Sequence, residues 1–197
     1  NMSYKKLTSI LIIYLSSFVN SYSIEPDVFV QSTVNRASEI LSENVPKEEK
    51  IRKLKIVALE TVDIKGIGFY TLGSVRKTLS DTEKKKYTQL FENYFLKSFS
   101  DRLSEYTNPK IDVQNKEVLS KNYTIVNSVL KATNDRPEIK IDWRIYTKNL
   151  ENPLIRDLII EGLSLARTQK EEFSSILNSN DGDINALFKT LEEFSKS

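Results

Sequence analysis

The chain has 197 residues, with 29 Lys and Arg, 27 Asp and Glu, and neither cysteine nor histidine. A chain of this length buries roughly 70% of the surface that its unfolded form exposes, so one domain can build a full core without disulfides. The missing residue types exclude thiolate metal sites, the usual zinc sites and every nucleophile that depends on imidazole. An enzyme made from this sequence would have to use Asp, Glu, Lys, Tyr or Ser.

The first 23 residues follow the three-part pattern of a secretory signal peptide. Lys5 and Lys6 precede a mostly apolar stretch at 7–19, and Ser21 and Ser23 are small residues at the positions that determine cleavage. The apolar stretch is shorter than the ~20 residues that span a bilayer, and a membrane anchor is the alternative interpretation. We therefore expect 1–23 to direct export and 24–197 to form a single domain.

Removal of this segment changes the charge balance. It takes away two lysines and no acidic residue, which leaves 27 basic and 27 acidic residues. A neutral chain lacks the basic field with which proteins bind nucleic acid. We therefore expect no nucleic-acid partner.

Apolar residues at helical spacing predict six helices. These cover about 30–41, 46–58, 64–72, 80–106, 165–176 and 184–194. The third contains Gly66 and Gly68, which weaken a helix but allow another element to approach closely. Gly73 is expected to end it.

The helix at 80–106 has the strongest local signals. Ser80 and Glu83 form a capping box, in which each side chain accepts a hydrogen bond from the other residue's backbone amide. Apolar and aromatic residues then follow on one broad face. They are Tyr87, Leu90, Phe91, Tyr94, Phe95, Phe99, Leu103 and Tyr106. This face is either an ordinary aromatic core or the lining of a ligand site, and we expect it to cover a sheet.

Alternating apolar residues between the helices predict about four strands. They lie near 111–113, 123–130, 139–145 and 158–160, with short connections between them. Short connections favour an antiparallel meander. Because its apolar face must be covered, we predict an α+β fold in which a curved antiparallel sheet is wrapped by several helices.

The sequence at 162–166, Gly-Leu-Ser-Leu-Ala, mimics the nucleophile elbow of hydrolases. Ser164 has no histidine to act as its base, because the chain contains none. We therefore interpret Ser164 as the residue that caps the following helix.

Two further patterns mimic binding or catalytic sites. Asp157 and Glu161 resemble a pair of catalytic carboxylates, but we interpret them as exposed acids on a strand. The polar stretch 178–183 resembles a calcium loop, yet Leu177 and Phe188 fall where the first and last ligands belong. We therefore expect no metal site and no catalytic residue.

Several motifs, in a single order from about residue 25 to residue 194, resemble the MlaC or toluene-tolerance family. They are Asp63-Ile64 with Leu72-Gly73, Leu103-Ser104-Glu105-Tyr106, Ile141-Asp142-Trp143-Arg144, and 161–165 followed by Thr168-Gln169 and Glu172-Phe173. The chain departs from the family pattern at Val75 and Pro153, where the family has aromatic residues. Each motif alone is weak, but their joint order is specific.

The resemblance implies a phospholipid carrier of the periplasm with an apolar cavity between sheet and helices. Its cargo would be phospholipid, with no cofactor and no catalytic centre. Its partners would be the substrate-binding subunits of an inner-membrane ABC transporter and an outer-membrane lipoprotein bound to a porin. Such a carrier, acting as a monomer, helps to maintain the lipid asymmetry of the outer membrane.

Periodicity and motif position together predict the residues that contact lipid. They are Phe69, Leu72, Leu90, Phe91, Tyr94, Phe95, Val126, Val129, Ile141, Trp143, Leu158, Ile160, Leu163 and Phe173. Two other functions stay open. One is a periplasmic enzyme of α+β type that uses a carboxylate such as Asp142 or Asp157 in an apolar cavity. The other is an interaction domain with a solid core and no ligand.

Overall fold

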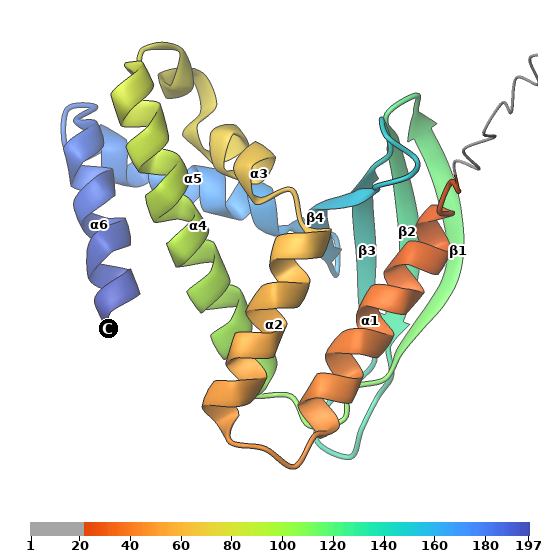
Figure 1. Cartoon of the computed structure of the whole chain (residues 1–197). Coiled ribbons are helices and arrows are strands. Elements are labelled where there is room, and N and C mark those ends of the chain that lie inside the picture. Colours follow the sequence, from red (N-terminus) through yellow and green to blue (C-terminus); the bar gives the residue numbers. More distant parts are fainter. Residues whose placement is uncertain (1–21) are drawn as a thin grey trace, which may run out of the picture.

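The computed structural model describes residues 22–197 as an α+β domain of six α-helices and a five-stranded sheet (Figure 1). The helices are α1 (Pro26–Ser42), α2 (Lys47–Thr61), α3 (Ile64–Leu72), α4 (Asp81–Ser104), α5 (Leu165–Asn178) and α6 (Ile184–Lys196), with a 3-10 turn, η1, at Gly73–Lys77. The strands are β1 (Ile111–Ser120), β2 (Tyr123–Leu130), β3 (Ile139–Tyr146), β4 (Leu154–Ile160) and β5 (Leu163–Ser164). The predicted fold class is confirmed, whereas the predicted signal peptide lies almost wholly outside the described residues.

The sheet is an antiparallel meander in the order β1-β2-β3-β4-β5. It has one strand more than the four predicted. β5 has only two residues, too few to show alternation in sequence. A tight turn joins it to β4, and both turn residues have positive φ, Glu161 at 48° and Gly162 at 82°. Such a turn matches the twist of a two-residue hairpin.

One face of the sheet, here called the inner face, is buried. In β2 and β3 every second residue is buried, which is the period of two expected for a half-covered sheet. The buried series are Thr124, Val126, Ser128 and Leu130 in β2, and Ile141, Trp143 and Ile145 in β3. α1 packs on β1 and β2, and α3 and α5 pack on β4. Three helices therefore share the cover of the sheet.

The helix α4 begins with the predicted capping box. The Glu83 amide donates to Ser80 Oγ at 3.1 Å, and the Ser80 amide donates to Glu83 Oε1 at 3.0 Å. Its packing differs from the expectation, since α4 lies against α2, α3 and α6 rather than over the sheet (Figure 1). The aromatic face of α4 is wide enough to pack against several helices. α3 and α5, and not α4, pack against β4.

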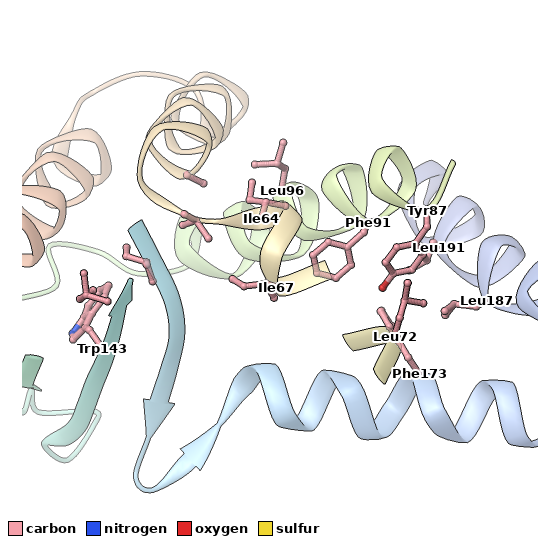
Figure 2. Packing of buried hydrophobic residues seen from close by; sticks show 14 of the residues in the cluster. Ile64, Ile67, Leu72, Tyr87, Phe91, Leu96, Trp143, Phe173, Leu187 and Leu191 are labelled. Carbon is pink, nitrogen blue, oxygen red and sulfur yellow. The ribbon is translucent and has the colours of Figure 1, made fainter. Parts of the chain in front are cut away.

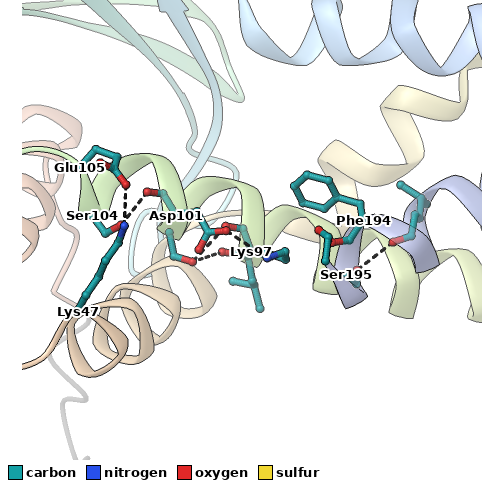
Figure 3. A network of polar contacts seen from close by, with 11 residues as sticks. Lys47, Lys97, Asp101, Ser104, Glu105, Phe194 and Ser195 are labelled. Carbon is teal, nitrogen blue, oxygen red and sulfur yellow. Dashed lines mark hydrogen bonds and ion pairs between the residues drawn. The ribbon is translucent and has the colours of Figure 1, made fainter.

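Exposed polar contacts join α4 to the neighbouring helices (Figure 3). Lys47 at the start of α2 donates to Glu105 Oε1 at 2.7 Å. Lys97 pairs with Asp101 within α4 at 3.3 Å, and its Nζ also lies 5.7 Å from the ring centre of Phe194 in α6. Exposed ion pairs add little stability, so these contacts mark where the helices meet rather than what holds them.

Among residues 22–197, no helix combines the length and the apolar character needed to cross a membrane.

Candidate functional site

One apolar cluster extends from the inner face of the sheet into the helices. In Figure 2, Trp143 of β3 lies at one end, and Tyr87 and Phe91 of α4 lie toward the other. Ile64 and Ile67 of α3 lie between them. The two halves of the fold therefore share one interior.

Phe91 is the centre of the helical end of this cluster. Its ring lies 5.8 Å from that of Tyr87, 6.1 Å from that of Phe95 and 6.3 Å from that of Phe173, which it meets edge-on. Tyr94 meets Phe173 at 5.8 Å. These centroid distances are those at which aromatic pairs stabilise each other beyond the area they bury. The Phe91 end of the cluster is therefore closely packed.

Gly68 of α3 allows Phe91 to pack this closely, as the sequence predicted. A Cβ at Gly68 would lie 2.8 Å from Cδ1 of Phe91, closer than real Cβ contacts. The Thr71 hydroxyl donates to the Gly68 carbonyl at 2.6 Å, and the Tyr87 hydroxyl lies 2.6 Å from Thr71 Oγ1. Because Thr71 has a single hydroxyl hydrogen, Tyr87 is the donor in that second bond.

Burial affects the ionisation of both tyrosines of α4. Loss of water around Tyr87 raises the pKa of its hydroxyl far above its usual range, although the bond to Thr71 opposes the shift. Burial also raises the pKa of Tyr94, whose hydroxyl donates to Gln169 Oε1 at 2.9 Å. Both side chains therefore stay neutral and act as apolar rings with one satisfied polar atom.

At the sheet end of the cluster, the polar atoms of Trp143 and Ser128 are satisfied by a chain of hydrogen bonds. Trp143 Nε1 donates to Ser128 Oγ at 2.8 Å, and the Ser128 hydroxyl donates to the Ile141 carbonyl at 2.7 Å. Trp143 stands between Val126 and Leu158 across the sheet. The surface that these side chains turn inward is therefore apolar.

The structure gathers twelve of the fourteen residues predicted to contact lipid into this cluster. Six are buried, namely Leu72, Phe91, Val126, Ile141, Trp143 and Phe173. Six more are partly buried and pack against them, namely Phe69, Leu90, Tyr94, Phe95, Leu158 and Ile160. Phe99 and Ile139, which sequence reasoning left out, are also partly buried there. Helical spacing could have indicated Phe99, and strand alternation could have indicated Ile139.

Val129 and Leu163 do not join the cluster. Val129 lies three residues after Val126 in β2, so alternation turns it to the opposite face of the sheet. Leu163 follows the tight turn after β4, and its side chain is exposed. Motif position suggested Leu163, but turn geometry decides its exposure.

Two grooves on the helical surface have volumes of about 610 and 430 Å³. The first is lined by Tyr70, Arg167, Lys170, Glu171, Ser174, Ser175, Asn178 and Ser179, and the second by Lys65, Phe69, Lys84, Lys85, Thr88, Gln89 and Glu92. Ligand pockets of this size are usually lined by apolar side chains. Most of the residues that line these two grooves are polar or charged, and of the residues predicted to contact lipid only Phe69 lines either groove.

The carboxylates that a catalytic alternative would use are engaged elsewhere. Asp142 accepts from Asn127 Nδ2 at 2.8 Å and lies 3.7 Å from Lys140 Nζ. It stands on the strand face opposite to Trp143, away from the apolar cluster. Among residues 22–197, no group of three or more acidic side chains is placed to hold a metal ion.

Asp157 and Ser164 together form the start of α5. The Ser164 hydroxyl donates to Asp157 Oδ2, and the Ala166 amide donates to Asp157 Oδ1 at 3.0 Å. Ser164 Oγ also accepts from the Arg167 amide at 3.1 Å. This is the helix cap that the sequence predicted for Ser164.

Comparison with known proteins places this geometry in a family. The family model of the MlaC protein matches residues 31–193. The chain belongs to the MlaC family. A search of curated proteins finds no match. The solved structure of a phospholipid-binding protein from Ralstonia solanacearum, in complex with a phospholipid at 1.53 Å, superposes with a TM-score of 0.74. The match covers 88% of this chain and 98% of that one at 14% identity, so the two proteins share a fold.

This MlaC-family chain accommodates its two departures from the family pattern within the core. Pro153, which stands where a tryptophan was expected, is fully buried directly before β4. Val75, in η1, packs against the apolar cluster. Smaller side chains at both positions leave the arrangement of the elements intact.

Proposed function

We propose that this chain binds a phospholipid and carries it across the periplasm, with the acyl chains held against its apolar cluster. Membership of the MlaC family supports this proposal, and so does the phospholipid bound to the Ralstonia solanacearum protein of the same fold. The observation that carries it is the gathering of twelve predicted residues, from sheet and helices, around one apolar interior. The charged residues that would serve a catalytic alternative lie outside that interior.

The partly buried members of the cluster are the best candidates for contact with acyl chains. A buried ring such as Phe91 already has protein neighbours around it. Tyr94, Phe95, Leu158 and Ile160 retain exposed apolar surface that a lipid tail can cover. Covering a tail is worth ~0.8 kcal/mol per methylene, so no catalytic or charged group is needed to retain the cargo.

We further propose where the carrier works and with what. Residues 1–23 would direct export to the periplasm, where the chain would act as a monomer. It would exchange lipid with the substrate-binding subunits of an inner-membrane ABC transporter and with an outer-membrane lipoprotein–porin complex. N-terminal sequencing of the exported protein tests the first step, with Ile24 expected as the first residue. A retained segment that fractionates with membranes would contradict cleavage.

Lipid extraction from the purified protein tests the cargo. After expression in a Gram-negative host, we expect mass spectrometry to find close to one phospholipid per chain. Phe95→Asp should lose the lipid while keeping its circular dichroism spectrum, because an acid placed against acyl chains must be desolvated. Leu59→Asp, on the exposed surface of α2, is the matched control and should keep the lipid. Native protein without lipid, or equal lipid in both variants, would count against the proposal.

Ser164→Ala separates the carrier from a hydrolase. Because Ser164 caps α5, the change should lower the free energy of unfolding by about 1 kcal/mol. Lipid content should be unchanged. An esterase activity that disappears in this variant would exclude the proposed function.

A further inference from the structure

The smaller of the two grooves lies between α3 and α4, which are neighbours in the fold (Figure 1). We call it the lysine groove. It is lined by Lys65 and Phe69 of α3 and by Lys84, Lys85, Thr88, Gln89 and Glu92 of α4. Three lysines face a single carboxylate there, whereas the chain from residue 24 onward has as many acidic as basic residues. The excess of positive charge is therefore local to this groove.

The three lysine amines of the groove are not neutralised by the fold. Within residues 22–197 none of them forms an ion pair, and the Nζ of Lys65 lies 5.9 Å from the centre of the Phe69 ring. Lys86, which does not line the groove, pairs with Glu192 at 3.5 Å. Lys84 and Lys85 also lie near the start of α4, the helix end at which positive charge is unfavourable. Because like charges repel, this arrangement favours the binding of an anion.

The donors in the lysine groove suit a phosphate group. A lysine ammonium has three donors and no acceptor, and it binds phosphate as a point charge. The side-chain amide of Gln89 has no hydrogen bond within residues 22–197, so it can donate to the same oxygen atoms. The hydroxyl of Thr88 is already used, since it donates to the Lys84 carbonyl at 2.9 Å. The volume of about 430 Å³ is in the range of pockets that hold small ligands.

Phe69 connects the lysine groove with the apolar cluster. Its side chain lines the groove and, partly buried, packs against the buried residues of the cluster. A ligand that has both an anionic group and hydrocarbon can therefore contact the lysines and the cluster at once. A free phosphate ion would use the lysines alone. The position of Phe69 thus favours an amphipathic phosphate over a purely polar one.

We propose that the lysine groove binds the phosphate group of the phospholipid cargo and that its charge selects anionic phospholipids. This inference rests on the proposed function, in which the chain carries phospholipid. The phosphate of phosphatidylglycerol leaves that lipid with a net negative charge, whereas the choline ammonium of phosphatidylcholine balances its phosphate. Three lysines attract both phosphates but repel the choline, and Glu92 offsets only one of them.

Lipid exchange with vesicles measures this selection. The purified full chain is incubated at low salt with vesicles of equal parts phosphatidylglycerol and phosphatidylcholine, then re-isolated and extracted. We expect the native chain to hold phosphatidylglycerol over phosphatidylcholine by roughly fivefold, the ratio that one exposed ion pair can give. At high salt the preference should disappear while the total lipid content stays the same, because salt screens charges and leaves apolar contacts intact.

Neutralising the groove should remove the preference. In the combined variant Lys65→Gln, Lys84→Gln and Lys85→Gln, we expect the two lipids in nearly equal amounts and an unchanged total. Glu92→Gln makes the opposite change, because it removes the only carboxylate that lines the groove, and should raise the preference by roughly twofold. An increase of this kind cannot come from a damaged fold, so this variant keeps the test decisive if the combined variant is unstable.

The matched control removes three positive charges elsewhere. Lys55 of α2, Lys121 of the β1–β2 turn and Lys148 of the β3–β4 loop lie outside the groove, and within residues 22–197 they form no ion pair. Lys55→Gln, Lys121→Gln and Lys148→Gln combined give the same net charge as the groove variant. This control should keep the native preference for phosphatidylglycerol.

The two measured quantities report on different proposals. Total lipid tests whether the chain is a carrier, and the ratio of the two lipids tests the lysine groove. A native chain that takes up no lipid would overturn both proposals, whereas equal uptake of the two lipids would overturn this inference alone. An equal loss of preference in the control variant would overturn it too. Calorimetric titration with inorganic phosphate covers the other source of the group. Saturable binding that the groove variant loses, without any preference between the lipids, would assign the groove to free phosphate instead.

Discussion

The two halves of α4 carry the same aromatic pattern but have different surroundings. In the first half, Tyr87 and Phe91 are buried against α3 and α5. In the second half, Phe95 and Phe99 stack on each other at 5.7 Å and stay partly exposed. One half is therefore a closed core, and the other keeps apolar surface that a ligand can cover.

The difference follows from the neighbours of each half. The first half meets Gly68 of α3, whose missing side chain admits the Phe91 ring, and Phe173 of α5 closes the other side. The end of α4 instead meets the start of α2, through the contact of Glu105 with Lys47 (Figure 3). Helical periodicity marks which side of α4 is apolar, but the neighbouring elements decide whether that side is filled.

Truncation of Phe91 and of Phe95 should give the largest difference in the free energy of unfolding between the two halves of α4. Phe91→Ala should lower the free energy of unfolding by about 3 to 5 kcal/mol, because it leaves a hole among four aromatic rings. Phe95→Ala should cost clearly less, below about 3 kcal/mol, because part of its ring has no protein neighbour to lose. Denaturant unfolding of lipid-free protein measures both. Equal losses would show that the two halves of α4 are packed alike.

A methyl group added at Gly68 should disturb only the closed half. Gly68→Ala places a Cβ 2.8 Å from Phe91, and overpacking of this kind costs about 1 to 3 kcal/mol. The gain in helix propensity, about 1 kcal/mol, offsets only part of that cost. The same unfolding experiment measures the loss.

A second substitution shows whether the loss comes from that contact. In Gly68→Ala combined with Phe91→Leu, the smaller side chain makes room for the methyl group. The double variant should then be more stable than the sum of the two single losses predicts. Strict additivity would place the effect of Gly68→Ala in the backbone of α3 instead.

Local signals in the sequence were enough for most of the fold. The Ser80–Glu83 capping box, the end of α3 at Gly73 and the cap at Ser164 were all predicted and are confirmed. Each depends on residues within a few positions of one another, so the sequence contains the whole interaction. The alternation in β3 likewise predicted that Trp143 faces the interior.

Features that depend on distant segments escaped prediction. The position of α4 beside α3 rather than over the sheet depends on how three helices share space. Val129 is a miss of another kind, because it was grouped with Val126 although strand alternation, a local signal, separates their faces. The hydrogen bond from the Ile24 amide to the Leu150 carbonyl joins segments that are far apart in the sequence, and no local pattern connects them. Contact among such segments is a property of the folded chain alone.

The pH dependence of stability should also differ between variants at the two tyrosines of α4. This is the smallest of the expected effects. Burial holds the pKa of Tyr87 far above the value of about 10 that the residue has in the unfolded chain. Its contribution to stability is thus fully present below pH ~10. Above that pH the unfolded state releases the proton while the folded state retains it, so stability falls as pH rises.

Replacement by phenylalanine removes that pH dependence. At neutral pH, Tyr87→Phe should cost only about 1 kcal/mol, since Thr71 loses one hydrogen bond but keeps its bond to the Gly68 carbonyl. Above pH ~10 the variant no longer shares the loss suffered by the native chain, so the two stability curves should converge. Tyr94→Phe should show the same direction with a smaller change, because that side chain is only partly buried. Urea unfolding at neutral and alkaline pH measures these differences. If the difference in free energy of unfolding between the native chain and Tyr87→Phe stays constant across pH, the Tyr87 hydroxyl ionises as freely in the folded as in the unfolded chain. The first half of α4 would then not be the closed core described above.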